Sequence, residues 1–232
     1  MRKWKAVVFD LDDTLYPESA FVLSGFRAVA AWMEERFGIN REKGLIQLRS
    51  LFEQGVRGNT FNLWLAQLGL EDQAEDLVPK LVEVYRNHNP RISPFPETQP
   101  ILERMRHSFL LGLVSDGHLG VQQRKWEALG LSQFFHAVVF SDAWGREAWK
   151  PNTKPFWEVL KMLEVAPHAA VYVGDNPLKD FFGARAIGMA TIWVRRPGGL
   201  YAHLQPPSTA HSADYIVDSL ESLAALVEQN AC

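Results

Sequence analysis

Three carboxylates stand directly after a short apolar run near the start of the chain. Ala6–Phe9 is uniformly apolar, which is typical of a strand buried on both faces, and Asp10, Asp12 and Asp13 follow it. If the strand continued, the side chains of Asp10 and Asp12 would point the same way; if it broke after Asp10, they would diverge around a concave site. Either geometry concentrates negative charge. Carboxylates this close need a cation or a shared proton, and Mg²⁺ takes oxygen ligands of this kind. A polar turn after a strand is the alternative explanation of this stretch taken alone.

Two other apolar runs end in the same polar way. Residues 109–114 lead into Ser115, and residues 169–173 lead through a glycine into Asp175. Ligands of open α/β sheets bind outside the carboxyl ends of the strands. We therefore expect Asp10, Ser115 and Asp175 to converge on one site at that edge of a sheet.

From residue 98 onward, apolar runs alternate with apolar stripes at helical spacing. Besides the strands already named, the runs predict strands at Ala137–Phe140, Ala190–Val194 and, near the edge, Tyr215–Val217. The stripes predict helices at about residues 98–105, 121–129, 156–163, 181–187 and 219–228. This order is typical of an α/β fold, a Rossmann-like parallel sheet with helices on both faces.

Residues 17–93 contain no convincing strand and carry four apolar stripes at helical spacing. Pro79 would break an interior helical turn, so we expect the fourth helix to begin later than its stripe implies. A proline-rich stretch, residues 89–96, marks a boundary. The sequence thus predicts a core formed by residues 1–16 and 94–232. The all-α insertion of residues 17–93 leaves the sheet after the first strand, and we expect it to lie over the site as a lid.

Composition narrows the class of protein. The 232 residues are 47% hydrophobic and 22% charged, which is typical of a globular protein with a sizeable core. A net charge of -3 and a pI ≈ 6.2 argue against nucleic acid or an anionic membrane as a partner and favour small substrates. The single cysteine, Cys232, permits no intrachain disulfide, and no stretch approaches the length of a signal-peptide core or a membrane span. We therefore expect a cytoplasmic protein, a monomer or a small homo-oligomer.

Four short motifs stand in order along the chain: residues 10–15 (Asp-Leu-Asp-Asp-Thr-Leu), Ser115-Asp116-Gly117, Lys150-Pro151 and residues 174–180 (Gly-Asp-Asn-Pro-Leu-Lys-Asp). With these motifs the chain resembles the haloacid dehalogenase-like (HAD) hydrolase superfamily, in its phosphatase branch with a helical cap inserted after the first motif. The resemblance covers the whole chain, and four motifs in register are far more specific than any one of them. The Asp-Asp-Thr-Leu variant is similar to that of nucleotidases and acylsugar-phosphate phosphatases.

The resemblance implies a role for each matched residue. Asp10 is the expected nucleophile, which forms an aspartyl-phosphate, and Asp12 is the expected general acid and base. Lys150 is expected to offset the carboxylates and to steady the transferring phosphoryl group. The implied cofactor is Mg²⁺, held by Asp10, the backbone carbonyl of Asp12 and Asp175, with Asp180 as a supporting acid.

The expected substrate-binding residues are Thr14, Ser115, Asp116 and Gly117, together with Lys150. The hydroxyl of Thr14 is expected to hold the turn after the first strand, and that of Ser115 to donate to a phosphoryl oxygen. Asp116 stands where many relatives have asparagine, and an ionised carboxylate aimed at a phosphate would repel it. We therefore expect Asp116 to turn its carboxylate away and to offer its backbone amide.

The function implied by the resemblance is that of a Mg²⁺-dependent phosphatase acting on a small phosphorylated metabolite, a sugar phosphate or a nucleoside monophosphate. Three alternatives stay open. A dehalogenase of the superfamily needs no acid at Asp12, because halide leaves without a proton, whereas a phosphomutase keeps both acids. A non-catalytic phosphometabolite-binding protein is expected to have lost one of four residues, all of which are present here: Asp10, Asp12, Lys150 and Asp175.

Overall fold

The computed structural model describes residues 4–230 and contains a six-stranded parallel sheet. Its strands are β1 (Ala6–Phe9), β2 (Leu110–Ser115), β3 (Ala137–Phe140), β4 (Ala170–Gly174), β5 (Ala190–Val194) and β6 (Tyr215–Val217). Their order across the sheet is β3-β2-β1-β4-β5-β6, and every neighbouring pair is parallel. β1 lies inside the sheet between β2 and β4, as its four fully buried residues require. The predicted α/β fold is confirmed.

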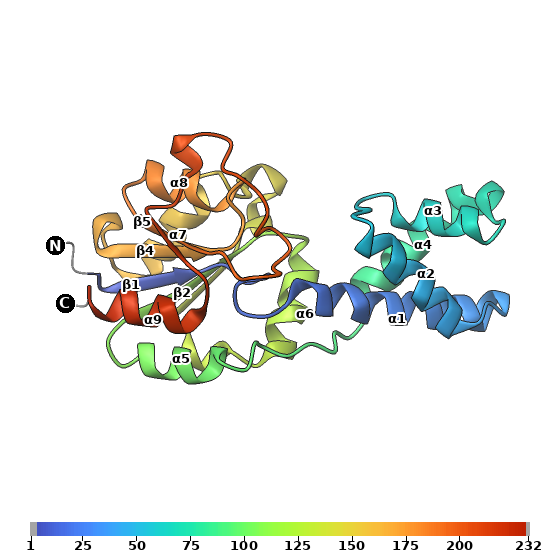
Figure 1. Ribbon diagram of the computed structural model, residues 1–232, viewed down its shortest axis with the longest axis horizontal. Helices are drawn as coiled ribbons and strands as arrows, with labels where there is room; N and C mark the ends of the chain where they lie inside the picture. The colour runs from blue at the N-terminus through green and yellow to red at the C-terminus, as the bar shows by residue number, and fades with distance from the viewer. Residues whose placement is uncertain (1–3, 231–232) are drawn as a thin grey trace. The chain divides into compact units, whose positions relative to one another are not determined.

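Helices cover both faces of this sheet (Figure 1). α7 (Lys154–Leu163) and α8 (Asp180–Ala186) pack on one face, and α5 (Thr98–Met105), α6 (Leu119–Leu129) and α9 (Leu220–Glu228) on the other. Gly112 in β2 allows α7 to approach closely, because a Cβ at this position would lie 2.9 Å from Cγ2 of Val159. No helix in the described part of the chain is long and apolar enough to cross a membrane. Cys232 lies outside the described residues.

Between β1 and α5 the described chain is helical, with no strand. The helices are α1 (Glu18–Phe37), α2 (Arg41–Glu53), α3 (Thr60–Gln67) and α4 (Ala74–Asn87). Contacts divide the protein into two compact units, residues 1–18 with 93–232 and residues 19–92. The second unit has its own apolar core, which includes Phe26, Met33 and Trp64. The predicted helical insertion after the first strand is confirmed, and its action as a lid stays a prediction.

The start of α4 differs from the expectation. The helix begins at Ala74, after a short 3-10 turn, so Pro79 lies inside it, and the prediction of a later start was wrong. Proline has no N–H, so Pro79 cannot donate the helical hydrogen bond to the Glu75 carbonyl. Pro79 and Glu75 are both exposed, so this carbonyl lies on the solvent side of the helix. Leu77 and Leu81 are buried in the core of this unit, and their packing offsets the missing hydrogen bond.

The sheet brings three polar strand ends together. β1 pairs with both β2 and β4, in a register that sets Phe9 beside Leu113 on one side and Val173 on the other. The residues that follow these positions, with Asp10 at the centre, therefore emerge at the same edge of the sheet. This edge is where the motifs of the sequence meet.

Candidate active site

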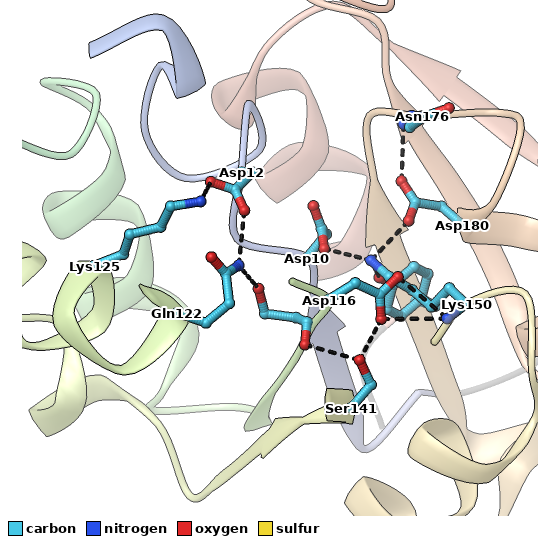
Figure 2. Close-up of polar contacts among 11 residues, drawn as sticks. Asp10, Asp12, Asp116, Gln122, Lys125, Ser141, Lys150, Asn176 and Asp180 are labelled. Atoms are coloured by element: carbon cyan, nitrogen blue, oxygen red, sulfur yellow. Dashed lines mark hydrogen bonds and ion pairs between the residues drawn. The ribbon is translucent and has the colours of Figure 1, made fainter. Parts of the chain in front are cut away.

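Asp10 is the first residue after β1 and lies at the centre of a buried polar cluster (Figure 2). Its backbone N–H donates to the Val173 carbonyl at 2.8 Å, which fixes the residue against the end of β4. Asp10 is only 2% exposed, and its Oδ1 accepts a hydrogen bond from the Lys150 ammonium. Its Oδ2 has no hydrogen-bond partner among the described residues. A buried carboxylate oxygen without a donor is costly, so this atom marks a place for a ligand or a reacting atom.

Lys150 is the cation of this cluster. Its fully buried Nζ donates to Asp10, to Oδ1 of Asp180 at 2.8 Å and to the Tyr172 hydroxyl at 2.9 Å. Burial opposes its charge, but the carboxylates of Asp10 and Asp180 outweigh burial and hold the pKa of Lys150 well above its usual value. Lys150 therefore supplies a permanent positive charge to the site.

Asp175 and Asp180 complete the group of carboxylates. One oxygen from each of Asp10, Asp175 and Asp180 lies within 4.8 Å of the others. Both oxygens of Asp180 are engaged, Oδ1 by Lys150 and Oδ2 by the Asn176 N–H at 2.8 Å. Oδ2 of Asp175, in contrast, is buried and has no partner in the described part of the chain. Two oxygens of the group, one on Asp10 and one on Asp175, are thus available for a ligand.

The mutual repulsion of these carboxylates shows in their pKa values. Burial and then the charges of Asp180 and Asp10 raise the pKa of Asp175 well above its usual value. Burial also raises the pKa of Asp10 to about 6, although Lys150 opposes it. A hard divalent cation fits this group, because it would supply the two missing partners and offset the repulsion. The donor set, which is all oxygen, suits Mg²⁺.

Asp12 lies beside this cluster and has hydrogen-bond donors of its own (Figure 2). Its Oδ1 accepts hydrogen bonds from the Lys125 ammonium at 2.7 Å and from the Tyr16 hydroxyl, and its Oδ2 accepts one from the Gln122 amide at 2.8 Å. Burial disfavours the charged form, but the charge of Lys125 and the donated hydrogen bonds outweigh it and hold the pKa of Asp12 below its usual value. Asp12 is therefore kept as a carboxylate with a fixed orientation.

Gln122 and Lys125 were not predicted from the sequence as functional residues. They stand three positions apart on α6 and so share one face of it, and they are only 1% and 6% exposed. Gln122 also donates to Oγ of Ser115 at 2.6 Å, so it joins Asp12 to the end of β2. The signal in the sequence was the pair of long polar residues at helical spacing directly after the second motif.

Asp116 directs its carboxylate toward the segments that follow β3. Its Oδ1 accepts a hydrogen bond from the Ser141 hydroxyl at 2.6 Å, and the backbone N–H of Lys150 lies 3.2 and 3.1 Å from Oδ1 and Oδ2. These donors account for both carboxylate oxygens. Gly117 follows with φ 126°, a backbone conformation that favours glycine.

Thr14 is fully buried, and its hydroxyl has no hydrogen-bond partner among the described residues. The expected hydrogen bond across the turn is therefore not seen. The backbone holds the turn instead, through the Leu15 N–H, which donates to the Leu11 carbonyl at 3.0 Å. The Thr14 hydroxyl is a third buried polar atom near this strand end that lacks a partner in the described chain.

Comparison with known proteins identifies the family. Residues 7–194 match the model of the haloacid dehalogenase-like hydrolases, a span that contains every motif described above. This chain belongs to the haloacid dehalogenase-like hydrolase family. It is 33% identical over 233 residues to the glyceraldehyde 3-phosphate phosphatase of Methanopyrus kandleri, and the match covers 98% of each chain.

Solved structures of the HAD family share the fold. A 2-haloacid dehalogenase from Pseudomonas syringae is 28% identical, with a TM-score of 0.65, and the match covers 98% of this chain and 100% of that one. Bacillus subtilis YfnB, a putative HAD hydrolase bound to magnesium, is 19% identical with a TM-score of 0.70 over 97% of this chain and 99% of that one. The HAD fold, with its helical insertion after β1, is thus confirmed, while the roles of single residues stay proposals.

Proposed function

We propose that this protein is a Mg²⁺-dependent phosphatase that hydrolyses a small sugar-type phosphomonoester, with glyceraldehyde 3-phosphate as its substrate, through an aspartyl-phosphate intermediate. The chain is a phosphoric monoester hydrolase of the HAD family, in accord with its family model and its full-length relatives. The observation that carries the mechanism is the contrast between two nearby carboxylates. Asp10 has one oxygen on Lys150 and one without a partner in the described chain, whereas three donors hold Asp12.

Asp10 is the proposed nucleophile. One oxygen of its carboxylate attacks phosphorus, forms an O–P bond and displaces the ester oxygen, while the other is available to bind the metal, so a difficult displacement is divided into two easier ones. Lys150 donates to Oδ1 of this carboxylate and thereby fixes its orientation. The same ammonium charge offsets the negative charge that gathers as the carboxylate and the phosphate approach each other.

Asp12 is the proposed general acid and base. In its protonated form it gives a proton to the departing ester oxygen in the first step. As the carboxylate left behind it accepts a proton in the second step from the water that attacks the aspartyl-phosphate, which restores the protonated form. The bonds from Lys125 and Gln122 fix its orientation for both transfers. Ser115 and the backbone amide after it are the proposed donors to the phosphoryl oxygens.

Asp10 and Asp175 are the proposed side-chain ligands of Mg²⁺, with the backbone carbonyl of Asp12 as a third. Asp180 keeps Lys150 in place through a 2.8 Å ion pair and so supports the ligands from behind. When bound, Mg²⁺ offsets the repulsion between the carboxylates and the phosphate. One oxygen each of Asp10 and Asp175 has no partner within residues 4–230, which supports this assignment, and YfnB, which shares the fold, was bound to magnesium.

The similarity to a haloacid dehalogenase raises the alternative of carbon–halogen cleavage. Asp12 weighs against it, because halide leaves without a proton and such an enzyme would not need a carboxylate held by three donors at this position. A phosphomutase would use the same two carboxylates, and it would return the phosphoryl group to a sugar instead of to water.

The test is phosphate release from glyceraldehyde 3-phosphate, other sugar phosphates, nucleoside monophosphates and p-nitrophenyl phosphate, with Mg²⁺ or with EDTA. We expect metal-dependent release that is greatest with glyceraldehyde 3-phosphate and is abolished by Asp10→Asn, a nearly isosteric change. Asp76→Asn, at an exposed position of α4, is the matched control and is expected to act as wild type. Release that persists in Asp10→Asn, or no release from any compound by the folded protein with Mg²⁺, would contradict the proposal.

A further inference from the structure

Asp13 joins two segments at the edge of the site. It has a positive φ of 54°, which is uncommon for a residue with a side chain, and it is only 7% exposed. Its Oδ1 accepts a hydrogen bond from the Glu18 N–H at 3.1 Å, and its Oδ2 accepts one from the Leu200 N–H at 2.6 Å. The residue next to Asp12 therefore fixes both the start of α1 and the loop after β5.

The side chains on these two segments meet. The Tyr201 hydroxyl donates to Oε2 of Glu18 at 3.3 Å, and both residues are partly exposed. Their pairing leaves most of the acceptor positions of the Glu18 carboxylate open, since a carboxylate offers about four. Neither residue has a role in the chemistry proposed above.

Glu18 lies within electrostatic reach of the general acid. Burial, followed by the charge of Asp12, raises the pKa of Glu18 to about 7, and Lys125 and Lys179 act in the opposite direction. The Tyr16 hydroxyl, two residues before Glu18, donates to Oδ1 of Asp12, and Asp13, the residue after Asp12, accepts from the Glu18 N–H, so the segment that carries Glu18 borders the general acid. Asp12 is proposed to act on the leaving-group oxygen, so a partly exposed side chain on this segment can meet the organic part of the substrate. Of the cations nearby, Lys125 is already paired with Asp12 at 2.7 Å.

We propose that Glu18, held in place by Tyr201 and Asp13, selects the organic part of the substrate. Its carboxylate accepts hydrogen bonds from hydroxyl groups or a hydrated aldehyde and repels a second anionic group. The substrate class is therefore a phosphomonoester whose carbon chain is uncharged and hydroxylated, as opposed to a phosphorylated acid. This inference rests on the proposed phosphatase function and narrows it.

The electrostatics of the pair favour this selection. The charge of Asp12 acts on Glu18, so a substrate carboxylate that approaches Glu18 would meet two negative charges. An uncharged hydroxyl meets no such repulsion and gains an acceptor that is already partly desolvated. Lys179 is the cation that would offset part of the repulsion, but the charges of Asp10 and Asp180 also act on it.

The test compares glyceraldehyde 3-phosphate with 3-phosphoglycerate. The two compounds share the same carbon chain, and at the end far from the phosphate the first carries an aldehyde and the second a carboxylate. We expect wild type at about pH 8, where Glu18 is charged, to favour glyceraldehyde 3-phosphate in kcat/KM. Glu18→Gln is expected to shift the ratio of the two kcat/KM values toward 3-phosphoglycerate by about tenfold, the effect of removing one nearby charge. Glu18→Asp, which keeps the charge, should retain the wild-type preference.

Two controls make the result decisive. Glu221→Gln removes the same charge from an exposed position of α9 and is expected to leave the ratio unchanged. The wild-type preference itself should weaken as salt is raised from about 0.01 M to about 1 M, because the Debye length falls about tenfold. This second measurement needs no variant, and a preference that salt leaves unchanged refutes selection by charge even if Glu18→Gln does not fold.

The outcomes separate this inference from the proposed function. If wild type hydrolyses the sugar phosphates and neither Glu18→Gln nor salt changes the ratio, the selection by Glu18 is refuted while the phosphatase stands. If wild type releases phosphate from neither compound nor from p-nitrophenyl phosphate, the phosphatase itself is refuted. A ratio that shifts in Glu18→Gln and not in Glu221→Gln supports both.

Discussion

The substitution Lys125→Met tests how far the site depends on the residues that hold Asp12. It removes the ammonium that lies 2.7 Å from Oδ1 of Asp12 and keeps an apolar side chain of similar length on α6. The two side chains are 7% and 15% exposed, so the pair is largely shielded from water. Removing one partner of a buried ion pair costs about 3–5 kcal/mol, because the other charge stays buried. Tyr16 and Gln122 still donate to Asp12, and we therefore expect a loss of about 2–3 kcal/mol in the free energy of unfolding.

The sign of the pH effect follows from the lowered pKa of Asp12. A carboxyl group whose pKa is lower in the folded state stabilises the protein above its ordinary pKa of 3.8, and this stability is lost as the pH falls through the folded value. The difference between wild type and Lys125→Met should therefore be full at neutral pH and shrink below about pH 4. With p-nitrophenyl phosphate, whose leaving oxygen needs little protonation, Asp12 acts mainly as the base of the second step and must be ionised, so the acid limb of the pH–rate profile should move to higher pH in the variant. The kcat should fall about tenfold to a hundredfold, because Asp12 loses a donor that fixes its orientation.

Urea unfolding at several pH values and kcat against pH measure these effects, with Lys161→Met, an exposed position of α7, as the control. The acid limb of the pH–rate profile distinguishes two roles of Lys125, holding Asp12 and packing in the core. A loss of packing alone would lower the free energy of unfolding without moving the acid limb. An acid limb that stays in place in a folded Lys125→Met would refute the reasoning. Equal destabilisation by Lys161→Met would refute it as well.

Two further predictions follow from the carboxylate group. Gly174→Ala should lower the free energy of unfolding in urea by about 1–3 kcal/mol, because the new Cβ would lie 2.5 Å from Oδ2 of Asp180. Gly120→Ala on α6 is the control and should not destabilise the protein, because the nearest atom to its Cβ would be 3.7 Å away. Equal stability of the two variants would contradict the close packing of β4 against Asp180. Mg²⁺ at about a hundred times its Kd should stabilise wild type by about 2.7 kcal/mol in thermal unfolding and should stabilise Asp175→Asn much less. An equal response of both proteins to Mg²⁺ would rule out Asp175 as a ligand.

The strands could be predicted from the sequence because a parallel sheet imposes the same local pattern on each of them. Each interior strand is largely a short apolar run, and in β1, β2 and β4 a buried polar residue stands where that run ends. The meeting of Asp10 and Asp175 at one edge could be predicted for the same reason. Pro79 misled the prediction of α4, because local propensity takes no account of the packing of Leu77 and Leu81 that stabilises the helix around it.

The partners of Asp12 could not be predicted in this way. Gln122 and Lys125 stand 110 and 113 residues away along the chain, and a helical stripe does not show which carboxylate the helix will face. The sequence also did not show that the Thr14 hydroxyl would lack a partner among the described residues, because an unsatisfied buried side chain leaves no periodic pattern in a sequence. Periodicity predicts which residues are buried, and only the three-dimensional arrangement shows which polar atoms are satisfied.

The pKa values of Asp10 and Asp12 are shifted in the direction opposite to their proposed roles, and the shift of Asp10 argues for the metal. A nucleophile should be ionised, yet burial raises the pKa of Asp10 to about 6, and a general acid should carry a proton, yet Lys125 helps to keep the pKa of Asp12 low. A divalent cation on the oxygens of Asp10 and Asp175 that have no partner in the described structure would favour the ionised form of both and so correct the first mismatch. The second mismatch has a consequence for the choice of substrate, because Asp12 seldom holds a proton. Esters whose leaving oxygen needs little protonation, such as p-nitrophenyl phosphate, should therefore gain in rate over alkyl phosphates. The ratio of the two rates should exceed the ratio expected from their binding alone.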